Sequence, residues 1–429
     1  MQELAAQSET NHRLRPRTAI LHYSAPPVVG GVEAVMEAHV RTFLQAGYPA
    51  GVFSGRGEAG AFPSGADFTR IPEMDTQHVR VLEISQALEK GEVPQDFHRL
   101  VDELEKRLYG ALDAYQIIIA HNLFTKHFNL PLTAAVYRLL DSGLQKRWIS
   151  WCHDASWTSE NSRRKLHPGY PWDLLRTYRP DISYVAVSRK RQQELVNLYG
   201  CEPEEVRVVY NGVDPGRLLG LTPEGELLAG RLGLLESDLV LLMPVRVTRA
   251  KNIELAIRVT AALKGQRLNP RLILTGPPDP HDADNMDYYH SLLALRKELG
   301  VEREMRFVFE SGPEPGEDYI IEQEVVADLY RMSDLVFLPS HREGFGMPVL
   351  EAALLGLPVV ASRIPAVEEI GLEDVVRVEP GDAPEEIAGR ILRLMEGIQA
   401  YRLGRKVRQN YTWEAIFRRD IEPLLQPAG

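Results

Sequence analysis

The chain has 429 residues, of which 44% are hydrophobic and 25% are charged. This composition is typical of a globular protein and excludes a disordered or collagen-like chain. At about 150 residues per domain, the length indicates two or three domains, each with a core of its own. Lysine and arginine total 49 against 60 aspartates and glutamates, so a net charge of −11 gives no overall attraction for nucleic acid or anionic lipid.

The two cysteines, Cys152 and Cys201, fit a reducing compartment and exclude a disulfide framework or a cysteine-rich zinc module. The N-terminal stretch is polar and lacks the apolar core of a signal peptide. The longest apolar runs are far shorter than the ~20 residues that a membrane span needs. We therefore expect a cytoplasmic protein with no integral membrane segment.

In the first half of the chain, short apolar runs alternate with amphipathic stretches, a pattern typical of βαβ units and parallel sheets. A helix is expected from 32 to about 46, and 54–110 is interpreted only as mixed helix and loop. The expected strands are 18–24, 115–120, 147–152, 183–188 and 206–209.

A break follows in the turn-rich segment 210–218, and the alternation then restarts. The expected strands of the second half are 239–247, 271–276, 305–310, 335–340 and 358–362. The sequence therefore predicts an α/β protein with two doubly wound, Rossmann-like domains, at 1–215 and 216–405. A helical segment at 406–429 is expected to pack back toward the N-terminal domain. Ligands of such sheets bind at the carboxyl ends of the strands, here in a cleft between the two domains.

The segment 335–362 carries the densest pattern. Its strand ends at Ser340, a loop with Gly344 and Gly346 follows, and Pro348 suits the first turn of a helix. Glycines let backbone amides approach a ligand closely, and a helix N-terminus adds partial positive charge. The combination predicts an anion site suited to phosphate.

Two carboxylates bracket this loop. Glu343 precedes it and Glu351 lies eight positions further on, so that both can face the same cleft. The alternative is an ordinary strand–turn–helix with solvated glutamates. The pair of carboxylates favours the functional interpretation.

This segment resembles the E-x7-E signature of family 4 glycosyltransferases, which are retaining enzymes with the GT-B fold of two Rossmann-like domains facing each other across a cleft. The resemblance extends over most of the chain, more weakly over 54–110 and 277–322. It implies that Glu343 contacts the transferred sugar and that Glu351 binds the ribose of a nucleotide. The backbone amides that it places against the diphosphate and sugar are those of Gly344, Phe345, Gly346 and Met347.

A second pattern, at 244–252, places cations at a strand-to-helix junction. Arg246 and Lys251 can neutralise a diphosphate leaving group there, although a solvated basic turn is a common alternative. The two residues resemble the R-x4-K pair of the family, which implies that role. Arg249 lies between them as a further candidate.

A third pattern is the glycine pair Gly30 and Gly31, which follows the first expected strand. Its amides can reach a phosphate, and the alternative is a tight βα turn. The stretch resembles the G-G-x-E loop of the family, which implies contact with the donor or the acceptor.

A fourth candidate is His153, at the end of an expected strand. It resembles the histidine that the family places beside the transferred sugar, and Asp154 could orient its imidazole. We interpret His22 and His121, which also end strands, as structural.

The sequence Asp282-Ala283-Asp284 spells the D-x-D motif with which other glycosyltransferases hold a divalent cation. Here it enters a helix, where aspartates serve as caps. Arg246 and Lys251 already supply the positive charge that a metal would bring, so neither a metal nor a cofactor is expected.

The resemblance therefore implies a retaining transfer of a hexose, glucose or mannose, from a nucleotide sugar to an acceptor hydroxyl. It implies that the domain at 1–215 is the acceptor side and the domain at 216–405 the donor side. The implied catalytic residues are His153, Glu343, Arg246 and Lys251. A sugar-nucleotide epimerase or phosphorylase on the same fold, or a silent sugar-nucleotide-binding subunit, remains an alternative. UDP, GDP and ADP donors stay open, and the acidic balance favours a small polar acceptor.

Overall fold

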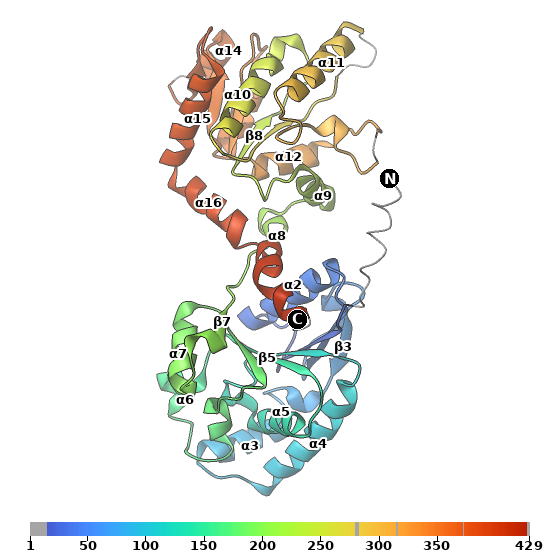
Figure 1. Cartoon of the computed structure of the whole chain (residues 1–429), viewed down its shortest axis with the longest axis vertical. Coiled ribbons are helices and arrows are strands. Elements are labelled where there is room, and N and C mark those ends of the chain that lie inside the picture. The colour runs from blue at the N-terminus through green and yellow to red at the C-terminus, as the bar shows by residue number, and fades with distance from the viewer. Residues whose placement is uncertain (1–14, 279–282, 315, 372, 427–429) are drawn as a thin grey trace. The chain divides into compact units, whose positions relative to one another are not determined.

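The computed structural model describes residues 15–278, 283–314, 316–371 and 373–426. The chain divides into two compact units. Figure 1 shows the first in blue to green, with its C-terminal segment in dark red, and the second in green to red. Unit 1 comprises Met1–Gly212 and Trp413–Gly429, and unit 2 comprises Val213–Thr412.

Unit 1 is built on a parallel sheet of seven strands in the order β3-β2-β1-β4-β5-β6-β7. The strands are β1 (Thr18–Leu21), β2 (Ala50–Ser54), β3 (Asp67–Arg70), β4 (Ile117–His121), β5 (Arg147–Cys152), β6 (Ile182–Ala186) and β7 (Val206–Val208). Its longer helices are α2 (Gly31–Gln45), α3 (Val79–Glu89), α4 (Gln95–Ala111), α5 (Leu130–Asp141) and α7 (Arg189–Tyr199). The strand order reverses between β1 and β4, which pair directly.

Both faces of this sheet are buried, which explains why its strands are apolar throughout rather than alternating. Ile20 and Ile119 point to the face covered by α2, whereas Leu21 and Ala120 point to the face covered by α3, α4 and α5. Successive side chains of a strand point to opposite faces, so each strand serves two cores.

Unit 2 is built on a parallel sheet of six strands in the order β10-β9-β8-β11-β12-β13. The strands are β8 (Leu239–Met243), β9 (Pro270–Leu274), β10 (Met305–Phe307), β11 (Leu335–Leu338), β12 (Val359–Ser362) and β13 (Val376–Val378). Its helices are α8 (Pro215–Leu219), α9 (Pro223–Leu232), α10 (Ile253–Gly265), α11 (Ala283–Glu298), α12 (Gln323–Met332), α13 (Met347–Leu354), α14 (Pro365–Gly371), α15 (Pro384–Gly397) and α16 (Gln399–Asn410). The order reverses between β8 and β11, and one continuous hydrophobic core surrounds the sheet.

These two doubly wound parallel sheets confirm the predicted α/β class. The expected strands 239–247 and 305–310 are shorter than predicted and end at Met243 and Phe307. In the first case Pro244 follows and cannot donate to a ladder. None of the described helices is long and apolar enough to cross a lipid bilayer.

The expected C-terminal segment 406–429 divides between the two units. Its beginning belongs to α16, which stays in unit 2: Tyr401 donates to the carbonyl of Asp238 at 2.8 Å, and Arg408 pairs with Asp334 at 2.8 Å. The prediction placed residues 406–412 with the returning segment, but these bonds hold the helix that contains them on the second sheet.

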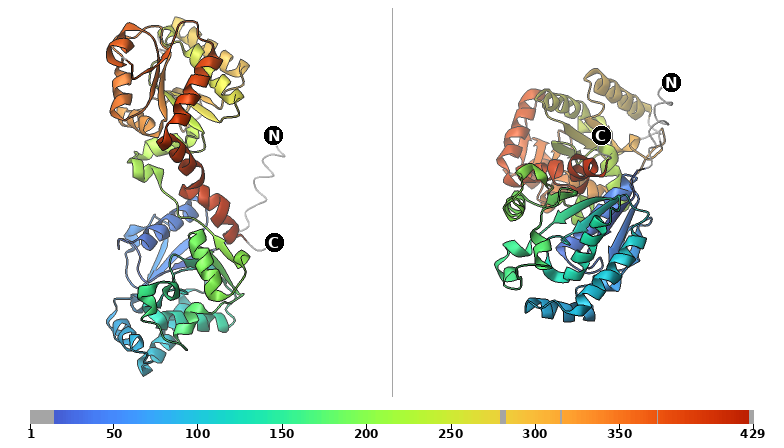
Figure 2. Two further views of the ribbon diagram at one scale, coloured as in Figure 1. Left: turned by 90° about the vertical axis from the view of Figure 1, so that its left-hand side faces the viewer. Right: turned by 60° about the horizontal axis from the view of Figure 1, so that its bottom comes forward.

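The remainder of the segment completes the core of unit 1. It forms α17 (Trp413–Ile416), η9 (Phe417–Ile421) and α18 (Glu422–Leu425). The side chains of Ile416, Ile421 and Leu425 are fully buried in the cluster that also contains Phe43 of α2. Figure 2 shows this stretch in dark red beside α2.

Candidate functional site

In unit 2, two loops follow the neighbouring strands β8 and β11. Because the strands are parallel, both loops leave from the same edge of the sheet, at the point where the strand order reverses. One loop carries Arg246 and Lys251, and the other carries Glu343. The backbone N–H of His341 donates to the carbonyl of Ala250 at 2.8 Å, which ties the loops together.

Glu343 is held by both loops. Its Oε2 accepts a hydrogen bond from the Lys251 ammonium at 2.6 Å, and its Oε1 accepts one from the Ser340 hydroxyl, also at 2.6 Å. The Glu343 side chain is 7% exposed and that of Lys251 is 20% exposed. Hydrogen bonds with ionised partners are among the stronger ones in proteins. The pair is therefore fixed before any ligand arrives.

The other two cations of this segment differ in their surroundings. Arg249 lies 4.7 Å from the centre of the Tyr288 ring, whose hydroxyl donates to Glu254 at 2.6 Å. Stacking thus holds Arg249 against α11. Arg246 is exposed and has no ion-pair partner within the described ranges of the chain. Arg249 likewise has no ion-pair partner among the described residues, so both arginines keep an unpaired charge.

The glycine loop after Glu343 ends in a helix start. Gly346 adopts a left-handed φ of 94°, and α13 begins at Met347 without a side-chain cap. Within the part of the chain that the structure describes, the amides of this loop donate no hydrogen bond. These amides belong to Gly344, Phe345, Gly346 and Met347. Unpaired amides at a helix N-terminus are a site for an anion.

Glu351 lies further along α13 and is held from the neighbouring α12. The hydroxyl of Tyr330 donates to its Oε2 at 2.5 Å. Tyr330 is buried, and its burial and the Glu351 carboxylate raise the pKa of its phenol, which keeps the proton on the donor. The second oxygen of Glu351, Oε1, has no partner within the described residues.

In unit 1, three histidines meet at the carboxyl ends of β1, β4 and β5. His22 donates through Nδ1 to the carbonyl of His121 at 2.9 Å. Nδ1 of His121 and Nε2 of His153 share a hydrogen bond of 2.9 Å, and the two rings stack with centres 5.2 Å apart. The structural interpretation of His22 and His121 is thus incomplete, because His121 contacts His153 directly and His22 is bonded to His121.

His39 of α2 joins this cluster, and the sequence analysis missed it. Its ring lies 5.3 Å from that of His121 and stacks on Phe43. It is fully buried, and neither ring nitrogen has a hydrogen-bond partner in the described structure. Burial lowers the pKa of His39 and of His153 to about 3 each, so both rings are neutral at physiological pH.

This cluster makes unit 1 sensitive to acid. A histidine with a usual pKa of about 6.5 takes up a proton on unfolding below that pH, whereas the folded ring stays neutral down to a pKa of about 3. Each such histidine therefore costs about 1.4 kcal/mol of stability per pH unit as the pH falls from about 6.5 toward 3. When the pH is lowered from about 7.5 to about 5, we expect the melting temperature of His39→Phe to fall less than that of wild type. Replacing the exposed His98 by glutamine is the control and should not change that loss.

The partner predicted for His153 is wrong. Asp154 does not orient the imidazole; its carboxylate pairs with Lys126 at 2.8 Å and with Arg191 at 3.2 Å. The backbone N–H of His153 instead donates to Oδ1 of Asn122 at 2.9 Å. The histidine is therefore positioned by Asn122 and by the His121 ring, because the aspartate lies beside two cations.

The glycine pair of unit 1 begins α2. A Cβ on Gly30 would lie 2.1 Å from Oε2 of Glu33, so a side chain there would displace that carboxylate. Glu33 is buried and accepts a hydrogen bond from Ser24 at 2.6 Å. A Cβ on Gly31 would meet open space. Gly30 thus makes room for Glu33, which explains the glycine without a ligand.

Two family models match the chain. The model for glycosyl transferases group 1 matches residues 228–410, and that for glycosyltransferase family 4 matches residues 29–217. The chain is a family 4 glycosyltransferase.

Individual relatives match this glycosyltransferase at modest identity or over part of its length. An uncharacterised glycosyltransferase of Methanocaldococcus jannaschii is 26% identical over 75% of this chain and 78% of its own. A D-inositol 3-phosphate glycosyltransferase of Stackebrandtia nassauensis is 36% identical over 40% of this chain, and the match spans 36% of that relative's length. Among solved structures, sucrose-phosphate synthase from Thermosynechococcus elongatus is 19% identical and has a TM-score of 0.37, with 96% of this chain and 98% of that chain covered.

Only part of the D-x-D sequence lies among the residues that the structure describes. Asp282 lies outside the described residues, and Asp284 lies in the first turn of α11, where an acidic residue favours the helix. Within the described ranges, no group of three or more histidine, cysteine, aspartate or glutamate side chains could hold a metal ion.

The hydrogen bond from Tyr330 to Glu351 gives a prediction about donor affinity. Removing the hydroxyl in Tyr330→Phe leaves the ring packing in place but frees the carboxylate to rotate. We expect the KM for a nucleotide-sugar donor to rise about three- to tenfold, the cost of about one hydrogen bond, with a smaller change in kcat. Tyr289→Phe, which removes an equivalent bond to Glu310 elsewhere in unit 2, should leave both constants unchanged. An unchanged donor KM in Tyr330→Phe would show that Glu351 needs no support.

Proposed function

We propose that this enzyme transfers a hexosyl group, glucosyl or mannosyl, from a nucleoside-diphosphate sugar to an acceptor hydroxyl with retention of configuration and without a metal. The observation that carries the proposal is the run of unpaired amides from Gly344 to Met347 at the start of α13. Arg246 and Lys251 lie in the adjoining loop. Together these groups fit a diphosphate, which needs several donors and positive charge.

The chemistry of the transfer sets two demands. Positive charge builds at the anomeric carbon while negative charge grows on the departing diphosphate. Arg246, Lys251 and the amides of the α13 start are the groups that stabilise the second charge. Glu343, already bonded to Lys251, accepts hydrogen bonds from the sugar hydroxyls. Glu351 accepts from the ribose hydroxyls through its unpaired Oε1.

The neutral state of His153 fits a role toward an uncharged group. Burial keeps this ring neutral, and a neutral imidazole suits a hydrogen bond to an uncharged hydroxyl. We therefore assign it a hydrogen bond to a hydroxyl of the transferred sugar. The proposed reaction needs no cofactor. We also propose a cytoplasmic location, which the free thiols of Cys152 and Cys201 support.

The test is a product analysis. The protein is incubated with UDP-, GDP- and ADP-linked glucose and mannose and with a pool of polar acceptors, with and without a chelator. NMR of the product should show the anomeric configuration of the donor, and the rate should not depend on the chelator. An inverted product, or activity lost to the chelator and restored by a divalent cation, would contradict the proposal. A nucleotide sugar returned with altered stereochemistry and no glycosylated acceptor would identify an epimerase instead.

A further inference from the structure

His121 belongs to a group of three buried aromatic rings in unit 1, together with His39 and Trp151. The rings of His39 and Trp151 lie 5.3 Å and 5.8 Å from that of His121 and 4.5 Å from each other. Four nitrogens of this group are enclosed and have no hydrogen-bond partner in the described structure: both of His39, Nε2 of His121 and Nε1 of Trp151. Buried polar atoms are usually paired, so the placement of the hydrogens in this group affects its stability.

The histidines of this region each carry a single ring hydrogen. Burial lowers the pKa of His39 and of His153 to about 3 each, and it lowers the pKa of His121 well below the usual value. All three rings are therefore neutral at physiological pH. In a neutral imidazole one nitrogen donates a hydrogen bond and the other accepts one. Nδ1 of His121 and Nε2 of His153 lie 2.9 Å apart, so one of the two donates to the other.

This hydrogen bond allows two arrangements. If His153 donates from Nε2, the hydrogen of His121 must sit on its enclosed Nε2, and Nδ1 of His153 is bare. If His121 donates from Nδ1, its Nε2 is bare and His153 carries its hydrogen on Nδ1. Nδ1 of His153 is thus an acceptor in the first arrangement and a donor in the second.

The enclosed group favours donation by His121. The indole N–H of Trp151 is always a donor, and His39 contributes one N–H and one bare nitrogen. A bare Nε2 on His121 balances the unpaired donors and acceptors of the group, whereas a hydrogen there would give three donors against one acceptor. In a medium of low dielectric constant a surplus of unpaired donors is costly, because their partial charges have the same sign.

Nδ1 of His153 lies on the open side of the cluster. It makes no hydrogen bond with a described residue and, unlike Nε2 of His121, it is not enclosed. The backbone of His153 is fixed by its bond to Asn122 at 2.9 Å. A ligand that reaches this ring therefore meets Nδ1.

We propose that His121 is a positioning residue that sets the tautomer of His153: it donates from Nδ1 to Nε2 of His153, which then offers an N–H at Nδ1 to the transferred sugar. This inference rests on the proposed function, in which His153 bonds a sugar hydroxyl, and it gives that bond a direction. The hydroxyl oxygen accepts from His153 and keeps its own hydrogen for another acceptor. The tautomer of a histidine is set by the hydrogen bond of its other nitrogen, which here is the bond to His121.

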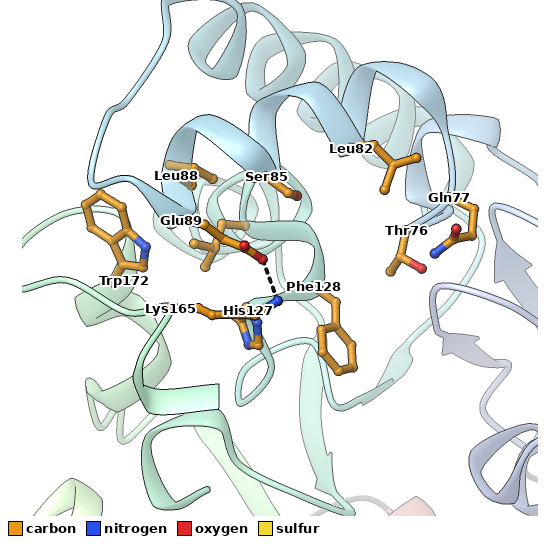
Figure 3. A pocket seen from close by; sticks show the side chains of 11 residues that line it. Thr76, Gln77, Leu82, Ser85, Leu88, Glu89, His127, Phe128, Lys165 and Trp172 are labelled. Carbon is orange, nitrogen blue, oxygen red and sulfur yellow. Dashed lines mark hydrogen bonds and ion pairs between the residues drawn. The ribbon is translucent and has the colours of Figure 1, made fainter. Parts of the chain in front are cut away.

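His127 provides an internal reference with the opposite tautomer. It lines a separate pocket of unit 1, which Figure 3 shows. Ser156 Oγ lies 2.7 Å from its Nδ1, and the Ser156 hydroxyl has no other acceptor among the described residues. The hydroxyl therefore donates to Nδ1, and the ring hydrogen sits on Nε2. Burial, with smaller effects of Lys126 and Lys165, lowers the pKa of His127 to about 4, so this ring is also neutral.

The test locates the ring hydrogens by NMR. The full chain is labelled with NMR-active nitrogen in its histidines, and the nitrogen signals distinguish a ring nitrogen that carries hydrogen from a bare one. The signals of His153 are those lost in His153→Gln. In ligand-free wild type we expect the hydrogen of His153 on Nδ1 and that of His127 on Nε2. A hydrogen on Nε2 of His153 overturns the proposal, and this measurement needs no variant of His121.

Two substitutions of His121 test whether this residue sets the tautomer. His121→Asn can place an amide N–H near the position of Nδ1, whereas His121→Leu removes the donor. In His121→Leu we expect the hydrogen of His153 to be no longer confined to Nδ1, and kcat/KM for glycosyl transfer to fall about three- to tenfold, as for the loss of one hydrogen bond. His121→Asn should restore the tautomer and most of the rate. His98→Gln, at an exposed position, should change neither.

Melting temperatures confirm that the variants fold, and binding of nucleoside diphosphate should be unchanged in all of them. A tautomer that stays confined to Nδ1 in His121→Leu overturns the role of His121. A changed tautomer with an unchanged rate shows that the hydrogen does not serve the reaction, which also overturns the proposal. Both results leave the proposed function standing. Failure of wild type to bind nucleoside diphosphate or to transfer sugar would instead count against the proposed function, because the spectrum of the ligand-free chain depends on neither.

Discussion

Replacing Lys251 by alanine is expected to lower kcat/KM for glycosyl transfer by at least about 100- to 1,000-fold, the usual cost of removing one preorganised electrostatic donor. In the proposed mechanism the ammonium opposes the charge that grows on the departing diphosphate, so its loss would act on the transition state. Glu343 keeps its bond to Ser340 in the variant, and the fold should remain intact. Steady-state rates and a melting curve test both parts.

Lys264→Ala is the matched control. This lysine, at the end of α10, pairs with Glu304 at 3.0 Å and donates to the carbonyl of Gly300, away from the loops of the site. It should retain the wild-type rate. A near-normal rate in Lys251→Ala would remove this lysine from the mechanism.

Replacing Glu343 by glutamine is expected to lower kcat by about 100-fold, or about 2.7 kcal/mol. The amide keeps the size of the side chain but removes the charge that fixes Lys251 at 2.6 Å. The lysine then loses its preset position, and in the proposed mechanism the sugar loses a charged hydrogen-bond acceptor. Glu310→Gln, which affects an ion pair with Arg296 at 2.8 Å elsewhere in unit 2, is the control.

The two substitutions should not be additive, because the side chains contact each other. In the double variant Lys251→Ala with Glu343→Gln, we expect a loss smaller than the product of the single losses. A full product would mean that the two groups act independently and that their ion pair has no role in the rate.

Most of the fold could be predicted because both sheets are parallel and covered on both faces. Their central strands are continuous apolar runs, such as Ile117–His121 and Leu239–Met243, which stand out from the amphipathic helices. Three strands were missed: Ala50–Ser54, Asp67–Arg70 and Val376–Val378. The first is fully buried, but its glycine and serine leave no continuous apolar run. The other two are short, partly exposed edge strands, so no apolar run marks them.

The structure brings the predicted Lys251 and Glu343 of unit 2 together because their loops follow two strands that are neighbours in the sheet. Several other side-chain contacts join distant elements and could not be inferred from sequence position. Tyr330 and His39 each lie among the apolar residues of a helix and resemble ordinary core residues. Asp154 was assigned to the wrong partner because its cation, Lys126, comes from the loop after another strand.

The return of the chain to unit 1 at Trp413 has a consequence for how the protein is made. Ile416, Ile421 and Leu425 cover Phe43 and Ile117, which are synthesised several hundred residues earlier. All of unit 2 leaves the ribosome before that cover exists, so the earlier-made unit is the later one to finish folding. During translation an apolar face near the N-terminal part of the nascent chain stays open to chaperones until the last helix emerges.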